Sequence, residues 1–522
     1  MTTDAASTSA PTTDAATNSA YRQIETHWRR LSQLSGAISA LHWDQSVMMP
    51  PGGAAARAEQ IATLRVLRHE MMTETRLGAL LDEAAAEVSS GSRENAPDKV
   101  RWRAANILEM RRRWVHATAV PADLVAAMSR AGSHCETIWR DARANSDFES
   151  VRPALADVLG LTKQIAEAKS DVLGCSEYDA LLDSYEPGGR SENIDVIFDN
   201  YAAFLPGFLD DVLTRQNATS ATTAPDGPFP LEKQKALCRR MAETVGFDFN
   251  EGRLDESLHP FSTGVPEDSR ITTRFEADDY TFALMGVLHE TGHAMYERGR
   301  PAAWRHQPVG DARGMVLHES QSLIVEMQAC RSRAFHDWAA PVHQDAFDGA
   351  GDAWGADNLY RRAIHVERGF IRVDADEVTY PAHVILRYRL ERALLAGDLI
   401  LSELPGAWND GMQALLNVTP PDDRRGCLQD IHWYDGAWGY FPTYTLGAMA
   451  AAQFFETAAT QESDLIPGLA RGDFAPLMTW LRKNVHAQAS SMSTNAIINA
   501  ATGRPLDDAA FKRHLHTRYL DR

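Results

Sequence analysis

Cysteine is scarce in this sequence, and the few cysteines form no pattern. The chain of 522 residues has five of them, an odd number, and no two are spaced as C-x-x-C. Such scattered cysteines are typical of a reducing compartment, and they provide neither a disulfide framework nor a thiolate metal site. The first twenty residues also lack the basic and apolar segments of a secretory signal. We therefore expect a cytoplasmic protein.

Long apolar runs and an excess of positive charge are also absent. No apolar stretch reaches the roughly 20 residues that a membrane-spanning helix needs. The formal net charge is −19 at pH 7, whereas nucleic acids and anionic membranes bind basic surfaces. We therefore expect neither nucleic acid nor a membrane among the partners of this protein.

The organisation of the chain is that of one large helical domain. Apolar residues recur at helical spacing over most of its length, for example Leu31, Leu34 and Ile38. Residues 1–19 are small and polar and have too few apolar side chains to fold, so we expect a disordered tail there. Residues 20–522 contain no evident linker, and we assign them to a single, all-α domain.

Two segments depart from the helical pattern. The stretch SRITTRFE, residues 269–276, alternates apolar or β-branched side chains on one face, which predicts a short strand. The stretch from Asn217 to Pro230 is rich in threonine, alanine and proline, which predicts an exposed loop between two helices.

The stretch GVLHETGHAMYERG, residues 286–299, contains the pattern H-E-x-x-H. Residues four apart share one face of a helix, so His289 and His293 would point the same way. Their ring nitrogens could bind one zinc ion, while Glu290 lies beside them to activate a water molecule. Gly292 lowers helix stability and suggests that another element approaches this helix closely. The alternative is a structural histidine pair that binds no metal.

A catalytic zinc site needs a third protein ligand, which must come from another part of the chain. The helical stretch LHESQSLIVEMQ, residues 317–328, offers His318, Glu319 and Glu326. Glu319 and Glu326 are seven residues apart, so both could face the H-E-x-x-H helix. Spacing alone does not decide between these candidates.

Further short blocks lie in order over most of the chain. They are LHWDQSVMMPPGG from Leu41, HPF from His259, DSRIT from Asp268, HETGH from His289, HESQ from His318, IRVDADEVTYPAHVILR from Ile371, GCLQDIHW from Gly426 and GYFPTYTLG from Gly439. Together these blocks resemble the carboxypeptidase Taq family of zinc metallocarboxypeptidases. The resemblance implies that Glu319 is the third zinc ligand.

The same resemblance carries expectations about fold and activity. It implies a nearly all-helical body with a very small β-sheet and a deep groove around the zinc, similar to neurolysin and angiotensin-converting enzyme. It also implies a cytoplasmic homodimer that removes single residues from free peptide C-termini with broad specificity, and in which cobalt can replace zinc. A zinc oligopeptidase or dipeptidase of the same architecture and an inactive peptide-binding scaffold are the alternatives.

An enzyme that removes C-terminal residues must recognise a carboxylate. Arginine does this best, because its planar fork can bind both oxygens. Arg372 and Arg270 lie in the family-like blocks, and we favour Arg372 for the substrate C-terminus. Each arginine could instead form a structural ion pair. The nearby partners are Asp374 or Asp376 for Arg372, and Asp268 for Arg270.

Other polar residues of these blocks are candidates for supporting roles. Tyr440, Tyr444 and His432 could donate hydrogen bonds to the oxyanion of the transition state, although tyrosines often pack structurally. After HESQ-S the family usually has arginine or methionine and then tryptophan, where this chain has Leu323 and Val325. If the family's arginine contacts bound peptide, the side-chain preference here shifts towards apolar residues. We expect five residues to orient the ligands and binding groups, namely His259, Asp268, Asp376, His383 and Gln429.

Overall fold

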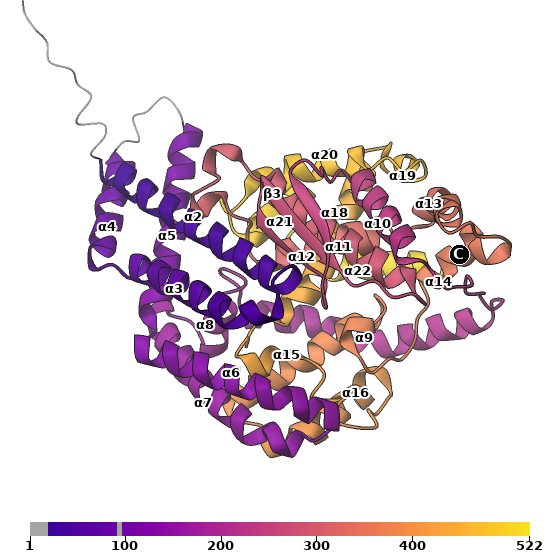
Figure 1. Ribbon diagram of the computed structural model, residues 1–522, viewed down its shortest axis with the longest axis horizontal. Coiled ribbons are helices and arrows are strands. Elements are labelled where there is room, and N and C mark those ends of the chain that lie inside the picture. The colour runs from indigo at the N-terminus through magenta and orange to yellow at the C-terminus, as the bar shows by residue number, and fades with distance from the viewer. Residues whose placement is uncertain (1–18, 91–96, 522) are drawn as a thin grey trace, which may run out of the picture.

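The structure is a computed structural model that describes residues 19–90 and 97–521. Most of the described chain is helical, as predicted (Figure 1). The tail expected over residues 1–19 lies outside the described residues, except for Ser19. The Ser19 hydroxyl accepts a hydrogen bond from the Arg22 N–H at 3.3 Å and so caps the first described helix, α2 (Ala20–Val47).

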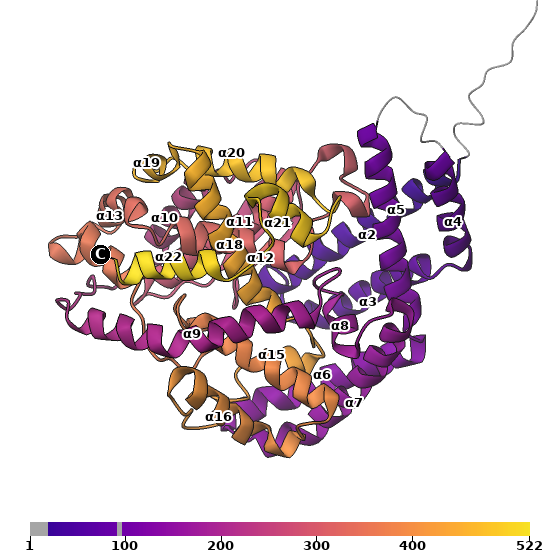
Figure 2. The same ribbon diagram turned by 180° about the vertical axis from the view of Figure 1, so that it is seen from behind.

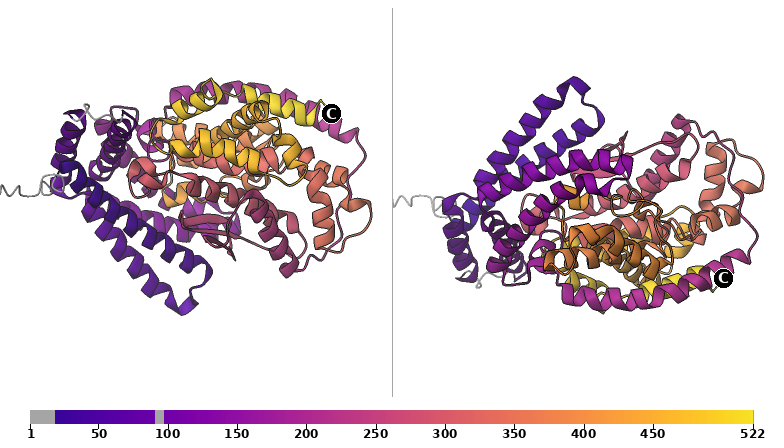
Figure 3. Two further views of the ribbon diagram at one scale, coloured as in Figure 1. Left: turned by 90° about the horizontal axis from the view of Figure 1, so that it is seen from above. Right: turned by 90° about the horizontal axis from the view of Figure 1, so that it is seen from below.

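The N-terminal helices have a small hydrophobic core of their own. α2 is followed by α3 (Ala54–Met72), α4 (Thr75–Ser90) and α5 (Pro97–Ala119), and α2 and α3 form a hairpin that projects from the molecule (Figure 3). On α2, Ile24, Trp28 and Leu31 lie on one helical face because they are spaced by three and four residues. These side chains are buried against α4 and α5.

The remaining helices, which Figure 2 shows from behind, share a much larger hydrophobic core that runs from Cys135 on α6 to Tyr519 on α22. None of the described helices has the length and apolar character needed to cross a membrane.

α9 ends at Asn217 and α10 begins at Leu231, so the predicted loop is confirmed. The helices of this body outside the metal site are α6 (Ala122–Asn145), α7 (Phe148–Leu173), α8 (Glu177–Leu182), α9 (Ser191–Asn217), α10 (Leu231–Val245), α13 (Arg333–Ala346), α14 (Ala356–Ala363), α15 (Tyr380–Ala396), α16 (Leu404–Leu416), α17 (His432–Asp435), α19 (Leu465–Leu469), α20 (Ala475–Asn484), α21 (Thr494–Thr502) and α22 (Ala509–Tyr519).

A three-stranded sheet precedes the H-E-x-x-H helix. The strands β1 (Gly252–Glu256), β2 (Phe261–Val265) and β3 (Asp268–Thr273) have the order β1-β3-β2, with β1 parallel and β2 antiparallel to β3. The strand predicted over residues 269–276 is therefore present as β3 but ends at Thr273. Both faces of this strand are covered, because Ile271, Thr272 and Thr273 are all fully buried.

At the centre of the body one helix packs between two others. They are α11 (Tyr280–Gly299), α12 (Met315–Leu323), which continues into the π-helical segment η4 (Ile324–Ala329), and α18 (Pro442–Gln461). A Cβ atom at Gly292 of α11 would lie 2.3 Å from the Gln321 carbonyl oxygen. A Cβ atom at Gly447 of α18 would lie 2.7 Å from the Glu319 Cβ. Glycine therefore permits α12 to approach both neighbours, as expected for Gly292.

Candidate metal centre

Two histidines of α11 and one glutamate of α12 form a cluster that could hold a metal ion. His289 and His293 lie one turn apart, with ring centroids separated by 4.9 Å. His293 Nε2 lies 3.7 Å from Glu319 Oε2, and each residue offers a ligand atom within 4.8 Å of the other two. The close contact between α11 and α12 at Gly292 brings these atoms together.

The hydrogen bonds of the two histidines fix which nitrogen faces the cluster. His289 Nδ1 donates to Glu326 Oε2 at 2.9 Å, and His293 Nδ1 donates to the His318 carbonyl oxygen at 3.0 Å. Both acceptors require a proton on Nδ1, so Nε2 is the atom with a free lone pair in each ring. Two imidazole nitrogens and a carboxylate, oriented in this way, fit a divalent transition metal.

The other two candidates for a third ligand have different partners. Glu326 binds His289 through one oxygen and Arg331 Nη2 at 2.7 Å through the other. The His318 ring stacks on the His293 ring and its Nε2 lies 3.1 Å from Glu297 Oε1. The geometry therefore favours Glu319.

Glu290 lies next to the cluster and is almost fully buried, with 7 % of its surface exposed. Burial raises the pKa of Glu290 to about 7, helped by the neighbouring Glu319 charge, while a hydrogen bond from Ser262 of β2 opposes this increase. A cation bound at the cluster would lower this pKa, because it stabilises the nearby carboxylate. Without a bound cation, Glu290 exchanges a proton near neutral pH.

Arg372 lies in a buried charge cluster with Asp430 and Arg387. Its Nη2 lies 2.7 Å from Asp430 Oδ1, and Arg387 Nε lies 2.6 Å from Asp430 Oδ2. Burial alone would raise the pKa of Asp430, but the charges of Arg372 and Arg387 outweigh it and hold this pKa well below its usual range. The ion-pair partner of Arg372 is therefore Asp430, and neither Asp374 nor Asp376 takes this place.

Tyr444, Tyr440 and His432 lie together beside this cluster. The Arg372 guanidinium carbon is 4.8 Å from the centre of the Tyr444 ring, and the Tyr444 hydroxyl is 3.3 Å from His432 Nε2. Burial, with a smaller effect of the Glu319 charge, raises the pKa of Tyr444 to about 12. Burial lowers the pKa of His432 to about 4. At neutral pH the tyrosine therefore keeps its proton and the histidine is uncharged.

Arg270 has the ion pair that was the alternative to carboxylate binding. Its Nη2 lies 2.6 Å from Asp268 Oδ2, and its Nε lies 3.0 Å from Asp268 Oδ1. The Arg270 guanidinium carbon also lies 4.3 Å from the centre of the Trp43 ring on α2. Its paired neighbour on β1, Arg253, lies 4.4 Å from the same ring. Through their contacts with Trp43, Arg270 and Arg253 therefore connect the sheet to the N-terminal hairpin.

The remaining predicted residues differ in what they contact. Gln429 accepts a hydrogen bond from the Arg372 N–H at 2.9 Å, so it holds the backbone of that arginine. Asp376 binds backbone N–H groups, including that of Val378 at 2.9 Å. His383 is fully buried, and no hydrogen-bond partner for its ring nitrogens lies within the described residues. His259 is exposed.

Some contacts were not expected from the sequence. Leu323 and Val325 are fully buried, and the expected shift in specificity stays a prediction. The sequence predicted no role for Arg331 or Arg387. Arg387 lies at the end of a family-like block, whereas no sequence pattern marks Arg331.

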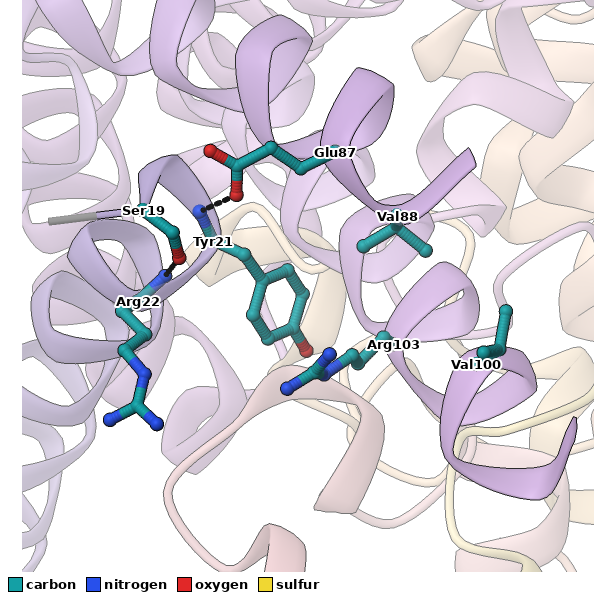
Figure 4. Close-up of a pocket in the computed structure, with 7 residues that line it drawn as sticks. All are labelled: Ser19, Tyr21, Arg22, Glu87, Val88, Val100 and Arg103. Carbon is teal, nitrogen blue, oxygen red and sulfur yellow. Dashed lines mark hydrogen bonds between the residues drawn. The ribbon is translucent and has the colours of Figure 1, made fainter. Parts of the chain in front are cut away.

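A separate pocket lies at the start of α2, between this helix, α4 and α5 (Figure 4). Glu87 accepts hydrogen bonds there from the backbone N–H groups of Ala20 at 2.7 Å and Tyr21 at 3.0 Å. Glu87 therefore satisfies N–H groups at the N-terminal end of α2. None of the pocket residues belongs to the metal cluster.

An H-E-x-x-H helix whose histidines meet a carboxylate from a second helix is the arrangement of a metallopeptidase. Residues 23–519 match the model of a family described as "Carboxypeptidase Taq (M32) metallopeptidase". The thermostable carboxypeptidase 1 of Thermus thermophilus is 36 % identical over 511 residues, which cover 96 % of this chain and 98 % of that protein. Carboxypeptidase 1 of Bacillus subtilis is 32 % identical, over 94 % of this chain and 96 % of that protein.

Solved structures agree with this match. Metallocarboxypeptidase 1 of Trypanosoma cruzi superposes with a TM-score of 0.92 at 36 % identity, over 96 % of this chain and 99 % of that one. A carboxypeptidase of Pyrococcus furiosus superposes with a TM-score of 0.89 at 30 % identity, over 96 % and 99 % of the two chains. The chain therefore belongs to the carboxypeptidase Taq metallopeptidase family and is a metallocarboxypeptidase.

Proposed function

We propose that the protein is a zinc-dependent carboxypeptidase that releases single residues from free peptide C-termini. His289, His293 and Glu319 are the zinc ligands in this proposal. The observation that carries it is the mutual approach of their three ligand atoms, together with Nδ1 partners that leave both Nε2 atoms available. Two histidines and one glutamate are a known ligand set of catalytic zinc.

Glu290 is the general base and then the general acid. Zinc, when bound, would polarise the scissile carbonyl and lower the pKa of a water molecule. Glu290 takes the proton of the attacking water and passes it to the leaving amine, as its position beside the ligands allows. Its burial, which raises its pKa, suits both steps. Tyr440 and Tyr444 are protonated donors for the oxyanion that develops on the substrate.

Arg372 binds the carboxylate of the substrate C-terminus. Arg372 and Arg387 share one carboxylate, Asp430, so the hydrogen-bonded group has two positive charges and one negative charge. This leaves a buried positive charge that attracts a carboxylate from outside. The Nε and Nη2 edge of Arg372 faces Asp430, and its guanidinium also forms a hydrogen bond with Tyr380. Gln429 fixes the backbone position of this arginine.

Several broader features follow the family resemblance. We include in the proposal that cobalt can replace zinc, that side-chain specificity is broad, and that the protein is a cytoplasmic homodimer. Residues 20–522 form one domain in the same proposal. The five scattered cysteines, all of them free, support the cytoplasmic location.

Two N-acetylated peptides of one sequence, one with a free and one with an amidated C-terminus, test this proposal. Each is incubated with zinc-loaded or cobalt-loaded protein, and the products are followed by mass spectrometry. We expect stepwise loss of single residues from the free peptide alone. Internal cuts in both peptides would instead identify an oligopeptidase, and no cleavage by the metal-loaded protein would contradict peptidase activity on these substrates.

A further inference from the structure

The segment that orients His289 is a short π-helix. α12 changes at Ile324 into η4, in which the Cys330 N–H binds the Val325 carbonyl, five residues earlier, at 2.8 Å. Glu326 lies in this segment and accepts the His289 Nδ1–H. π-helical turns are rare, and they are frequently found at functional sites. The position of Glu326 therefore depends on what holds this turn.

The C-terminal helix binds the end of this π-helical turn. Arg518 of α22 donates from Nη1 to the Met327 carbonyl at 2.7 Å and from Nη2 to the Gln328 carbonyl at 3.1 Å. These are carbonyls near the C-terminal end of a helical segment, where backbone acceptors lack intrahelical partners and a cation is favourable. The planar fork of arginine suits two consecutive carbonyls. Figure 2 shows α22 lying across the body beside α18.

Arg518 is itself held by a buried carboxylate. Its Nη1 lies 2.8 Å from Glu377 Oε1, and Glu377 also accepts the Tyr519 hydroxyl at 2.9 Å and lies 3.1 Å from His514 Nε2. Burial opposes ionisation of Glu377, but the Arg518 charge outweighs it and keeps the pKa of this carboxyl well below its usual range. α22 is thus fixed to the chain just after Asp376, and Arg518 is 8 % exposed.

We propose that Arg518 is a positioning residue for the metal ligand His289. By holding the Met327 and Gln328 carbonyls it fixes the π-helical turn, and the turn holds Glu326 against His289 Nδ1. Arg331 supports the other oxygen of Glu326. This inference rests on the proposed metal site. It adds that the last helix of the chain, which supplies no ligand, sets the geometry and affinity of that site.

Metal dissociation constants test this proposal, measured by competition of Zn²⁺ or Co²⁺ with a chromophoric chelator well below the unfolding temperature. Arg518→Met should raise the dissociation constant about 10-fold, because loss of a group that orients a ligand typically costs 10–100-fold in metal affinity. The visible spectrum of the cobalt-loaded variant should shift as the ligand geometry changes. The matched control is Arg513→Met, since Arg513 lies on the same helix, is 54 % exposed and pairs with Glu456. It should leave both measurements unchanged.

A second variant covers the case in which Arg518→Met does not fold. Arg518→Lys keeps the charge opposite Glu377 but cannot bind both carbonyls with one planar group. It should still raise the dissociation constant at least about threefold. Combined with Glu326→Gln, it should add little to the loss caused by Glu326→Gln alone, because both act on His289 through one chain of contacts.

A folded Arg518 variant with a lower unfolding temperature but wild-type metal affinity and cobalt spectrum would overturn the positioning role. Additive effects of Arg518→Lys and Glu326→Gln would overturn it too. A His289→Ala variant separates this failure from failure of the proposed site. If His289→Ala binds metal as tightly as the wild type, the metal lies elsewhere and both proposals fail. If it loses metal while the Arg518 variants do not, only the positioning role fails.

Discussion

Arg372 and Arg270 each bind an aspartate, but the two regions around them differ in charge and burial. Arg372 shares Asp430 with Arg387, so two guanidinium groups meet one carboxylate inside the helical body. Arg270 pairs with Asp268 on strand β3 of the sheet, and the side chain of Asp268 is 47 % exposed. The same residue pair can therefore leave a positive charge for a ligand in one place and fix a strand in another.

The largest expected effect is a loss of peptidase activity when Arg372, but not Arg270, is replaced. Arg372→Met should cost about 2–5 kcal/mol of transition-state binding, as for a truncated partner of a buried charge pair. That corresponds to roughly 30-fold to 5,000-fold in kcat/KM for a peptide with a free C-terminus. The preference for free over amidated peptide should vanish as well.

Arg270→Met is the matched control for this measurement. It should change kcat/KM by less than about threefold and keep the preference for the free C-terminus, because Asp268 balances the charge of Arg270 at a partly exposed pair. A loss of that preference in Arg270→Met, but not in Arg372→Met, would reverse the assignment.

The next effect concerns stability and compares the two aspartates. Asp430→Asn leaves two buried guanidinium groups without their counter-charge, which should destabilise the fold by about 3–5 kcal/mol. Asp268→Asn, at a partly exposed pair, should cost about 0–1 kcal/mol. Urea unfolding with saturating metal measures both values.

The low pKa of Asp430 also gives this stability difference a pH dependence. The pKa of Asp430 in the folded state lies below its ordinary value of 3.8. The stabilisation by ionised Asp430 is therefore fully present above about pH 4, and it is lost progressively as the pH falls towards the folded-state pKa. If Asp430→Asn and Asp268→Asn destabilised the fold by similar amounts, the proposed difference between the two ion pairs would be wrong. The same holds if the difference in unfolding free energy between the two variants did not shrink in acid.

A smaller effect on stability comes from Glu391, a buried carboxyl whose charge interacts with Arg387. This carboxyl accepts hydrogen bonds from Tyr178 at 3.0 Å and Trp433 at 2.9 Å, and burial raises its pKa to about 7. Between its ordinary pKa of 4.5 and about 7, the folded state holds a proton that the unfolded chain has released. Stability should therefore fall as pH rises through this window.

Glu391→Gln should reduce that slope by up to about 1.4 kcal/mol per pH unit. The slope should not disappear, because burial also raises the pKa of Glu186 to about 7. Unfolding curves at several pH values between 4.5 and 7 make the measurement. Parallel pH profiles for the wild type and Glu391→Gln would show that Glu391 titrates normally.

The sequence was most informative where local geometry decides the outcome. Helical spacing placed His289 and His293 on one face, and Gly292 correctly indicated a close neighbour. β-alternation located β3, although the strand is shorter than predicted. The helical class of the fold followed from periodicity, and the family resemblance supplied the small sheet.

The remaining contacts depend on segments far apart in the chain. The choice among His318, Glu319 and Glu326 required their contacts in space. Glu326 binds His289 Nδ1 and Arg331, and His318 lies against Glu297. Asp430 is 58 residues from Arg372, so spacing pointed instead to the nearer Asp374 and Asp376. Arg518 lies almost 200 residues from the carbonyls that it binds, and no local pattern could associate them.

The central claim is that one carboxylate performs the proton transfer at a metal held by three other residues. Metal content and turnover of Glu290→Gln test it most directly, with His289→Ala as the variant that should lose metal. We predict that Glu290→Gln keeps one zinc per chain while turnover of a free-C-terminus peptide falls about 10²–10⁴-fold. Wild-type turnover in this variant, or loss of its zinc, would contradict the account.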